Sequence, residues 1–232
     1  MPETGAEHGR RTDEDWVAHL EREQRRYADG EARLPGAADS DARQRQLTRL
    51  GNAAGGAGLA LLMQGRRAEA AEWCRRAAER YRESFADAPP DSWGRPLGAM
   101  KALVLAGDRP GADDAARWAL DAGAAAALSP IGQYAAALAL LLLGEDARAR
   151  RHADAIRIRD DFPHDVGDAL AFVAAGDVLD YTDAIESVLA SFEARDEYLE
   201  DLPVADTVLV LQELARERGL DVPLSSALLP PA

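Results

Sequence analysis

The chain has 232 residues, of which 49 are alanine and only 6% are aromatic, so its apolar side chains are mostly small. This composition favours alanine-rich helices and argues against a β-sandwich or β-barrel, which would need more Val, Ile, Thr and aromatic residues. The formal net charge of -14 argues against a general electrostatic affinity for nucleic acid phosphates or anionic membranes. We therefore expect an all-α protein that binds neither nucleic acid nor membrane.

The basic residues are almost all arginine, and Lys101 is the single lysine. Together with abundant Ala, Asp and Gly, this is typical of a GC-rich genome such as that of a halophilic archaeon or an actinobacterium. The single cysteine, Cys74, has no partner for an internal disulfide, and its neighbours Trp73 and Ala77 indicate an apolar helix face. We expect its side chain to be a small buried hydrophobic group.

No segment of the sequence resembles a targeting or membrane-spanning element. Residues 1–15 are charged throughout and lack the apolar centre of a secretory signal. The longest apolar run, from Ala135 to Leu143, is too short to cross a bilayer. We expect a cytoplasmic protein.

The N-terminal part predicts two helices joined by a loop. Residues 1–12 are expected to be disordered, and Thr12 is expected to cap a helix that begins with three acidic residues. Residues 30–40 contain Pro and Gly and predict a loop. Ser40 is then expected to cap a long helix that runs to about Gln64.

From there to residue 219 the chain repeats one pattern: an apolar helix, a glycine, and a second helix with spaced alanines. A glycine after the last apolar residue suits the left-handed conformation that ends a helix, and such short turns make consecutive helices antiparallel. The pattern predicts one helical-repeat domain over residues 13–219. The glycines, at spacings of 42, 37, 32 and 43 residues, are Gly65, Gly107, Gly144, Gly176 and Gly219.

Small residues in the first hairpin have a familiar spacing. Gly58, Gly65, Ala70 and Ala77 fall at offsets 0, 7, 12 and 19, where tetratricopeptide-like repeats keep small residues so that two helices approach closely. The chain resembles that family over roughly residues 41–218, and the resemblance implies an α-solenoid of stacked antiparallel hairpins that binds other proteins. The later hairpins keep fewer of these positions, namely Gly107, Ala112, Ala119, Gly144 and Ala149.

The C-terminus predicts a helix from Leu202 to Arg218 and, because prolines forbid its continuation, a short extended tail over residues 220–232 that packs on the last hairpin. From about Leu202 onward, the arginine-glycine helix end, the short apolar segment and the final leucine-proline resemble the ending of the all-helical family-49 immunity proteins of polymorphic toxin systems. That resemblance implies a non-enzymatic protein that binds and neutralises a toxin.

The acidic residues are concentrated in the second half. Residues 160–206 contain 14 acidic side chains and one basic residue, Arg195. On a concave repeat surface this acidic block would suit a basic protein partner, although a solvated exterior adapted to high salt, or self-association of the array, are alternatives. The predicted partner-binding residues are Asp161, Asp165, Asp168, Asp177, Asp180, Asp183 and Glu186.

An enzymatic alternative depends on Asp161, His164, Asp165 and Asp168. Their offsets of 0, 3, 4 and 7 would place three carboxylates and an imidazole on one helical face, a set of ligands that suits a divalent ion. The simpler interpretation is that Asp160 or Asp161 caps a helix whose first turn contains Pro163, and that Asp165 complements its dipole. The sequence has no zinc-ligand spacing and no nucleophile motif, so we expect neither a metal, a cofactor nor a catalytic residue.

The glycine-rich stretch at Gly51, Gly55, Gly56 and Gly58 is not a phosphate-binding loop. It lacks the Gly-Lys-Ser/Thr ending, and no strand precedes it. Small residues three and four positions apart instead predict a close approach of a neighbouring helix.

Overall fold

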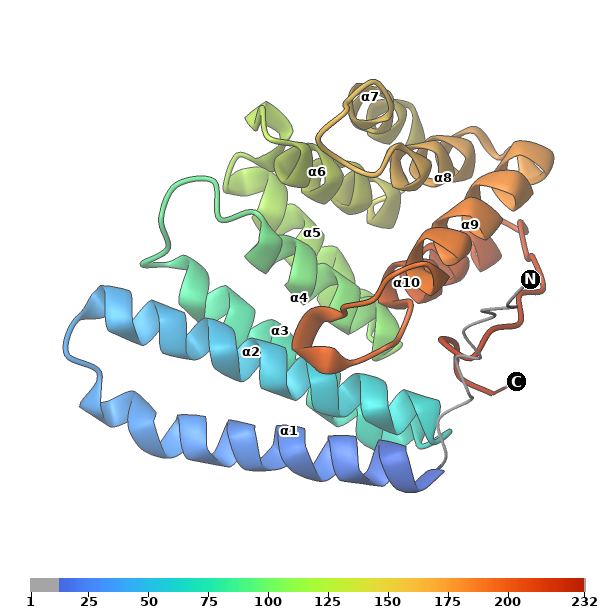
Figure 1. The fold of residues 1–232 in the computed structure, drawn as a ribbon. Helices are drawn as coiled ribbons and strands as arrows, with labels where there is room; N and C mark the ends of the chain where they lie inside the picture. The colour runs from blue at the N-terminus through green and yellow to red at the C-terminus, as the bar shows by residue number, and fades with distance from the viewer. Residues whose placement is uncertain (1–12, 232) are drawn as a thin grey trace, which may run out of the picture.

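The structure is a computed structural model that describes residues 13–231. These residues form ten α-helices and three short 3-10 helices, without a β-strand (Figure 1), which confirms the predicted all-α class. The α-helices are α1 (Asp13–Arg33), α2 (Ser40–Met63), α3 (Arg67–Phe85), α4 (Gly94–Leu105), α5 (Arg109–Asp121), α6 (Pro130–Leu142), α7 (Asp146–Arg157), α8 (His164–Ala175), α9 (Val178–Glu193) and α10 (Asp206–Arg216).

Helix α1 extends further than predicted. It continues through Gly30, where a loop was expected, and the connection to α2 is confined to residues 34–39. Gly30 is buried against α2, and a Cβ atom at that position would lie 2.7 Å from Leu50 Cδ2. The glycine therefore serves close helix packing rather than a turn.

The N-terminus of α2 differs from the prediction by one residue. Asp39, and not Ser40, is the cap, because its carboxylate accepts a hydrogen bond of 2.7 Å from the backbone N–H of Ala42. The predicted disorder of residues 1–12 and the predicted cap at Thr12 lie outside the described residues.

Four consecutive pairs of helices pack as hairpins: α2 with α3, α4 with α5, α6 with α7, and α8 with α9. The turn of each hairpin contains a glycine with positive φ, as the glycine pattern predicted. A side chain would be strained in this left-handed conformation. The φ angles are 72° at Gly65, 65° at Gly107, 73° at Gly144 and 69° at Gly176.

The spaced small residues lie where the helices of a hairpin meet. All five alanines that the repeat pattern identified are fully buried. A Cβ atom at Gly58 would lie 2.6 Å from Cys74 Sγ, and one at Gly51 would lie 2.7 Å from the Tyr81 ring, so both glycines bring α3 close to α2. These alanines are Ala70, Ala77, Ala112, Ala119 and Ala149.

The hairpins follow one another in a curved row, but the chain then turns back. Helix α10 packs against α4 as well as against α8 and α9, so that the last helix closes the concave side of the row (Figure 1). The prediction that this helix begins at Leu202 is wrong. Residues 202–205 are not helical, because Pro203 disfavours a helical conformation at the residue before it and the apolar side chains of this segment are buried instead.

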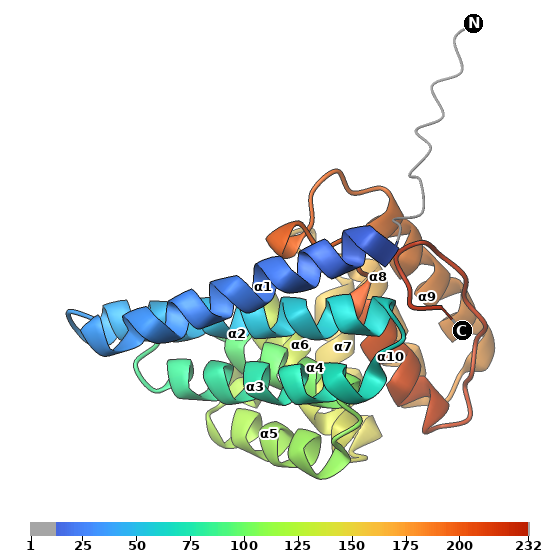
Figure 2. The same ribbon diagram turned by 90° about the horizontal axis from the view of Figure 1, so that it is seen from below.

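The C-terminal tail runs without helix along α10 (Figure 2). Its residues Leu220, Val222 and Leu228 are buried. The backbone N–H of Ala205 donates to Leu228 O at 3.0 Å, and Gln212 Nε2 donates to Val222 O at 2.9 Å. Among the described residues, no helix is both long enough and apolar enough to cross a membrane.

Candidate binding cavity

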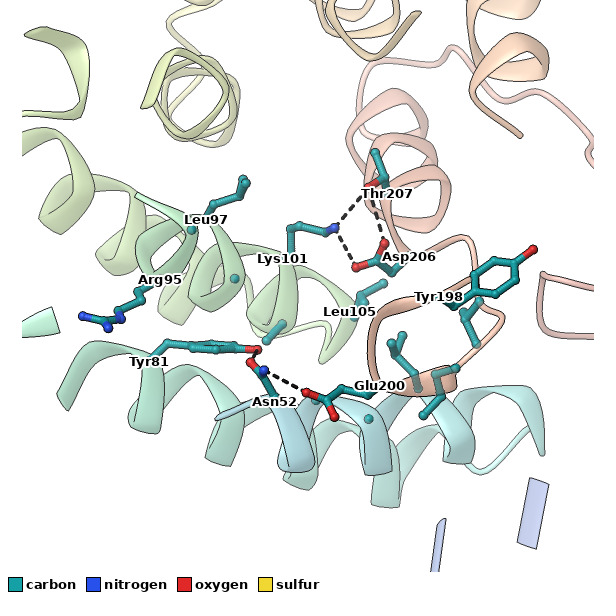
Figure 3. Close-up of a pocket in the computed structure, with 18 of the residues that line it drawn as sticks. Asn52, Tyr81, Arg95, Leu97, Lys101, Leu105, Tyr198, Glu200, Asp206 and Thr207 are labelled. Carbon is teal, nitrogen blue, oxygen red and sulfur yellow. Dashed lines mark hydrogen bonds and ion pairs between the residues drawn. The ribbon is translucent and has the colours of Figure 1, made fainter. Parts of the chain in front are cut away.

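A cavity of about 670 Å³ lies on the concave side of the row of hairpins (Figure 3). Helices α2, α3 and α4 form one wall, and α6, the start of α8, the end of α9 and the segment from residue 198 to 207 form the other. The first turn of α10 contributes Asp206 and Thr207 to the second wall. The cavity volume is in the range of roughly 300 to 1,000 Å³ that is usual for small-molecule sites.

Lys101 is the central polar group of one wall. Its ammonium lies 2.6 Å from Asp206 Oδ2 and donates a hydrogen bond of 3.1 Å to Thr207 Oγ1, so α4 is joined to the first turn of α10 (Figure 3). The Lys101 side chain is 15% exposed. Burial lowers the pKa of Lys101, but the neighbouring Asp206 carboxylate outweighs that effect and the net pKa is raised, which keeps the ammonium protonated at neutral pH.

A second cluster of polar side chains includes residues of α2 and α3. Tyr81 donates its hydroxyl to Asn52 Oδ1 at 3.0 Å, and Asn52 Nδ2 donates to Glu200 Oε1 at 2.9 Å (Figure 3). Glu200 also pairs with Arg26 of α1, and Arg22 Nη2 donates to its backbone oxygen at 2.5 Å. These contacts hold the segment that carries Glu200 across the concave side, even though Glu200 itself has a left-handed φ of 57°.

Two further polar side chains line the cavity without a comparable partner. The hydroxyl of Tyr134, on α6, is buried and lies near Thr207, but it makes no hydrogen bond of normal geometry with any described residue. Arg195 follows α9, and its guanidinium carbon lies 3.7 Å from the ring centroid of Phe192. No ion pair joins Arg195 to a carboxylate within residues 13–231.

The remainder of the lining is mostly apolar. It combines aliphatic side chains of α2 and α4 with aromatic and aliphatic side chains of the opposite wall. A ligand in the cavity would therefore need an apolar body as well as groups that satisfy the polar side chains. The main apolar residues are Leu59, Leu97, Leu105, Ile131, Phe162, Val166, Phe192, Leu202 and Val204.

The thiol and phenol groups that line the cavity keep their protons near neutral pH. Burial raises the pKa of the Cys74 thiol to about 12, so the thiol stays protonated. Burial, with the nearby Asp206 and Glu200 charges, raises the pKa of Tyr81, and burial raises that of Tyr134. The prediction that Cys74 is a buried hydrophobic group is confirmed, since its side chain is 1% exposed.

The raised pKa of Cys74 predicts a loss of stability in alkali. The unfolded chain releases the thiol proton near pH 9, whereas the folded protein keeps it to about pH 12. The free energy of unfolding should therefore fall as the pH rises from 9 to 10, by up to about 1.4 kcal/mol from this one group. Urea unfolding at both pH values tests this: Cys74→Ala should show a smaller fall than the wild type, and an identical fall would contradict the assignment.

The structure divides the predicted partner-binding residues into two sets. Asp161 pairs with Arg159 at 2.7 Å, Asp168 pairs with Arg157, and Asp165 is buried with an oxygen 3.0 Å from the backbone nitrogen of Val166. The other set belongs to α9. Asp177 caps that helix, and its exposed outer face carries Asp180, Asp183 and Glu186.

The alternative with a divalent-metal cluster is not supported by the structure. Asp161 lies before α8 rather than within it, and Asp165 is buried whereas its neighbour His164 is exposed. No group of three or more His, Cys, Asp or Glu side chains in the described part of the chain is arranged to hold a metal ion. The predicted cap at Asp160 or Asp161 is wrong, because Pro163 occupies the cap position of α8 without a side-chain hydrogen bond.

The acidic block does not lie wholly on the exposed surface. Glu200 and Asp206 face the cavity, where they pair with Arg26 and Lys101, and only part of the block is exposed on α9. The sequence pattern did not predict the cavity or the role of Tyr134, which belongs to an apolar helix. Two signals were nevertheless present: Lys101 is the only lysine and Arg195 is the only base in the block, and both line the cavity.

Comparison with known proteins does not place the chain in a family. No family model matches it, and neither a curated protein nor a solved structure matches it significantly.

Proposed function

We propose that this protein is a binding protein whose central cavity is the ligand site. The observation that carries the proposal is a cavity of about 670 Å³ that is lined by polar groups of Lys101, Tyr134 and Arg195, from three separate parts of the chain. Several convergent polar groups in a largely apolar hollow are the usual composition of a ligand site. Binding is favoured over catalysis because the thiol and phenols here have raised pKa values and Lys101 is held as an ammonium.

Gly55 offers a way to fill the cavity without disturbing the helices. It lines the cavity, and a Cβ atom there would lie no closer than 3.9 Å to its neighbours Ala77 and Tyr81. We expect Gly55→Leu to project into the cavity and to abolish saturable binding of the uncharged fluorophore N-phenylnaphthylamine, while the wild type binds one equivalent. Fluorescence titration measures both.

The matched control is Ala28→Leu, which adds a leucine to the exposed surface of α1, away from the cavity lining. This variant should bind the fluorophore as the wild type does. The proposal fails if the wild type shows no saturable binding, or if Gly55→Leu binds as tightly as Ala28→Leu.

The outer face of α9 supports a second candidate function, the capture of a basic protein. Asp180, Asp183 and Glu186 are exposed and make no ion pair with a described residue, and Leu179 beside them is 77% exposed. Carboxylates around an apolar anchor suit a basic partner. We propose neutralisation of a toxin as one form of this function, which the C-terminal resemblance to immunity proteins supports.

Neutralising the three α9 carboxylates tests this candidate. The triple variant Asp180→Asn, Asp183→Asn, Glu186→Gln should lose a protein that the wild type captures from its native host, and capture by the wild type should weaken as salt is raised. The control variant Asp29→Asn, Glu21→Gln, Asp41→Asn removes three exposed carboxylates from α1 and α2 and should capture normally. Equal capture by both triple variants would eliminate the α9 face.

We further propose that the four hairpins are tetratricopeptide-like units of a short solenoid. The left-handed glycines, the fully buried alanines and the sequential packing of the hairpins support this arrangement. The return of α10 to α4 would then close the concave face that such repeats use for binding.

A further inference from the structure

One end of the cavity has hydrogen-bond donors that the protein leaves unused. An ammonium has three N–H donors, and Lys101 directs two of them to Asp206 and Thr207. The third has no acceptor among the described residues and belongs to a side chain that lines the cavity. A ligand with an acceptor oxygen would complete the coordination of Lys101.

Tyr134 points to the same conclusion from another helix. Its side chain is only 4% exposed, and among residues 13–231 its hydroxyl meets only the Thr207 side chain, without a hydrogen bond of normal geometry. The hydroxyl is close enough to Lys101 and Thr207 for both side chains to affect the pKa of Tyr134. Thr207 Oγ1 already accepts a hydrogen bond from Lys101, so an acceptor that arrives with the ligand would satisfy the O–H of Tyr134.

The balance of charges at this end of the cavity determines the sign of the charge that a ligand should carry. The Lys101 ammonium is compensated by the Asp206 carboxylate, but Arg195 adds a positive charge that no described carboxylate pairs with. Arg195 is close enough to act electrostatically on Lys101. The end therefore has one net positive charge, in a protein of net charge -14.

From these observations we infer that the cavity binds a free organic acid with a single carboxylate and an apolar body. The carboxylate accepts hydrogen bonds from Lys101, Tyr134 and Arg195, and the body lies against the apolar part of the lining. A monoanion matches the uncompensated charge of Arg195 at this end, and the cavity volume of about 670 Å³ suits a small molecule. This inference rests on the proposed function of the cavity.

The test uses three ligands of one chain length that differ only in the head group. Decanoate, decanol and decylamine, each below its micellar concentration, compete with N-phenylnaphthylamine for the wild-type protein. We expect decanoate to displace the fluorophore at a concentration about tenfold or more below that of decanol, because a charge-assisted hydrogen bond adds to burial of the same apolar chain. Decylamine should be the weakest competitor.

Two variants assign the preference to the protein groups. Arg195→Gln should weaken the binding of decanoate by about tenfold and leave the binding of decanol unchanged. Tyr134→Phe, which removes only the hydroxyl, should weaken decanoate by about threefold. The control Arg25→Gln makes the same change of net charge on α1, where the Arg25 side chain is 70% exposed, and should leave both ligands unchanged.

The outcomes separate the inference from the function on which it rests. If the fluorophore binds but decanol competes as well as decanoate, the cavity remains a ligand site, and the inference that its ligand is an organic acid is wrong. The ligand could instead be a peptide with a free C-terminus. If an apolar hexapeptide binds more tightly than decanoate, and the same peptide with an amidated C-terminus does not, the carboxylate belongs to a peptide and the inference of a small organic acid is wrong. Absence of fluorophore binding would reject the cavity itself.

Discussion

Replacing Lys101 by methionine is expected to lower the free energy of unfolding by about 2 kcal/mol, since it leaves the Asp206 carboxylate without its ion-pair partner. The effect should be smaller than for a completely buried pair because the Asp206 side chain is 32% exposed. Lys101 joins α4 to α10, so the loss should affect the contact that closes the cavity. Urea unfolding followed by circular dichroism measures the change.

The matched double variant identifies the cause. Lys101→Met combined with Asp206→Asn removes the remaining charge and should be more stable than Lys101→Met alone. Because the folded pKa of Lys101 is raised above its ordinary value of 10.5, the contribution of the pair is fully present below that pH and is lost as the pH rises through the folded pKa. A double variant as unstable as the single variant would show that the lysine acts through packing rather than charge.

Gly58→Ala is expected to destabilise the protein although alanine is the better helix former. A Cβ atom there would lie 2.6 Å from Cys74 Sγ and 3.4 Å from the backbone oxygen of Ala70, so α2 and α3 would have to separate. Such overpacking costs about 1 to 3 kcal/mol. That cost exceeds the roughly 0.5 to 1 kcal/mol that alanine gains over glycine inside a helix.

Gly55→Ala provides the comparison within the same helix. Its Cβ atom would contact nothing closer than 3.9 Å, so the helix-propensity gain of about 0.5 to 1 kcal/mol should appear as increased stability. The double variant Gly58→Ala with Cys74→Ala removes the sulfur that the new methyl group meets, and should be more stable than Gly58→Ala alone. If Gly58→Ala and Gly55→Ala have the same effect, the close approach at Gly58 is not a constraint on the fold.

Gly58 and Gly55 show how much of the helix packing a sequence pattern can predict. Their spacing along α2 predicted a nearby helix, and at Gly58 that prediction is confirmed. Gly55 belongs to the same pattern but faces the cavity. The spacing cannot distinguish the two positions, because it places residues on a helix surface without determining what lies opposite each residue.

The charged residues of the candidate site show the same limit of sequence-based prediction. The sequence predicted an acidic block, and counting charges could not separate the exposed carboxylates of α9 from Asp206, which pairs with Lys101 inside the cavity. Lys101 and Asp206 are far apart in the chain and meet only because α10 packs on α4. The apolar segment around Tyr134 gave no sign that its hydroxyl would be buried without a hydrogen bond of normal geometry.

By itself the sequence determined the all-α class, the left-handed glycines of the hairpin turns and the burial of the spaced alanines, because each depends on local backbone preference or on the periodicity of one helix. Only the tertiary structure decided that α10 turns back to α4 and that the single lysine and Arg195 line one cavity. That result depends on contacts between residues distant in sequence. Local propensity does not contain those contacts, and packing of the whole chain is required to select them.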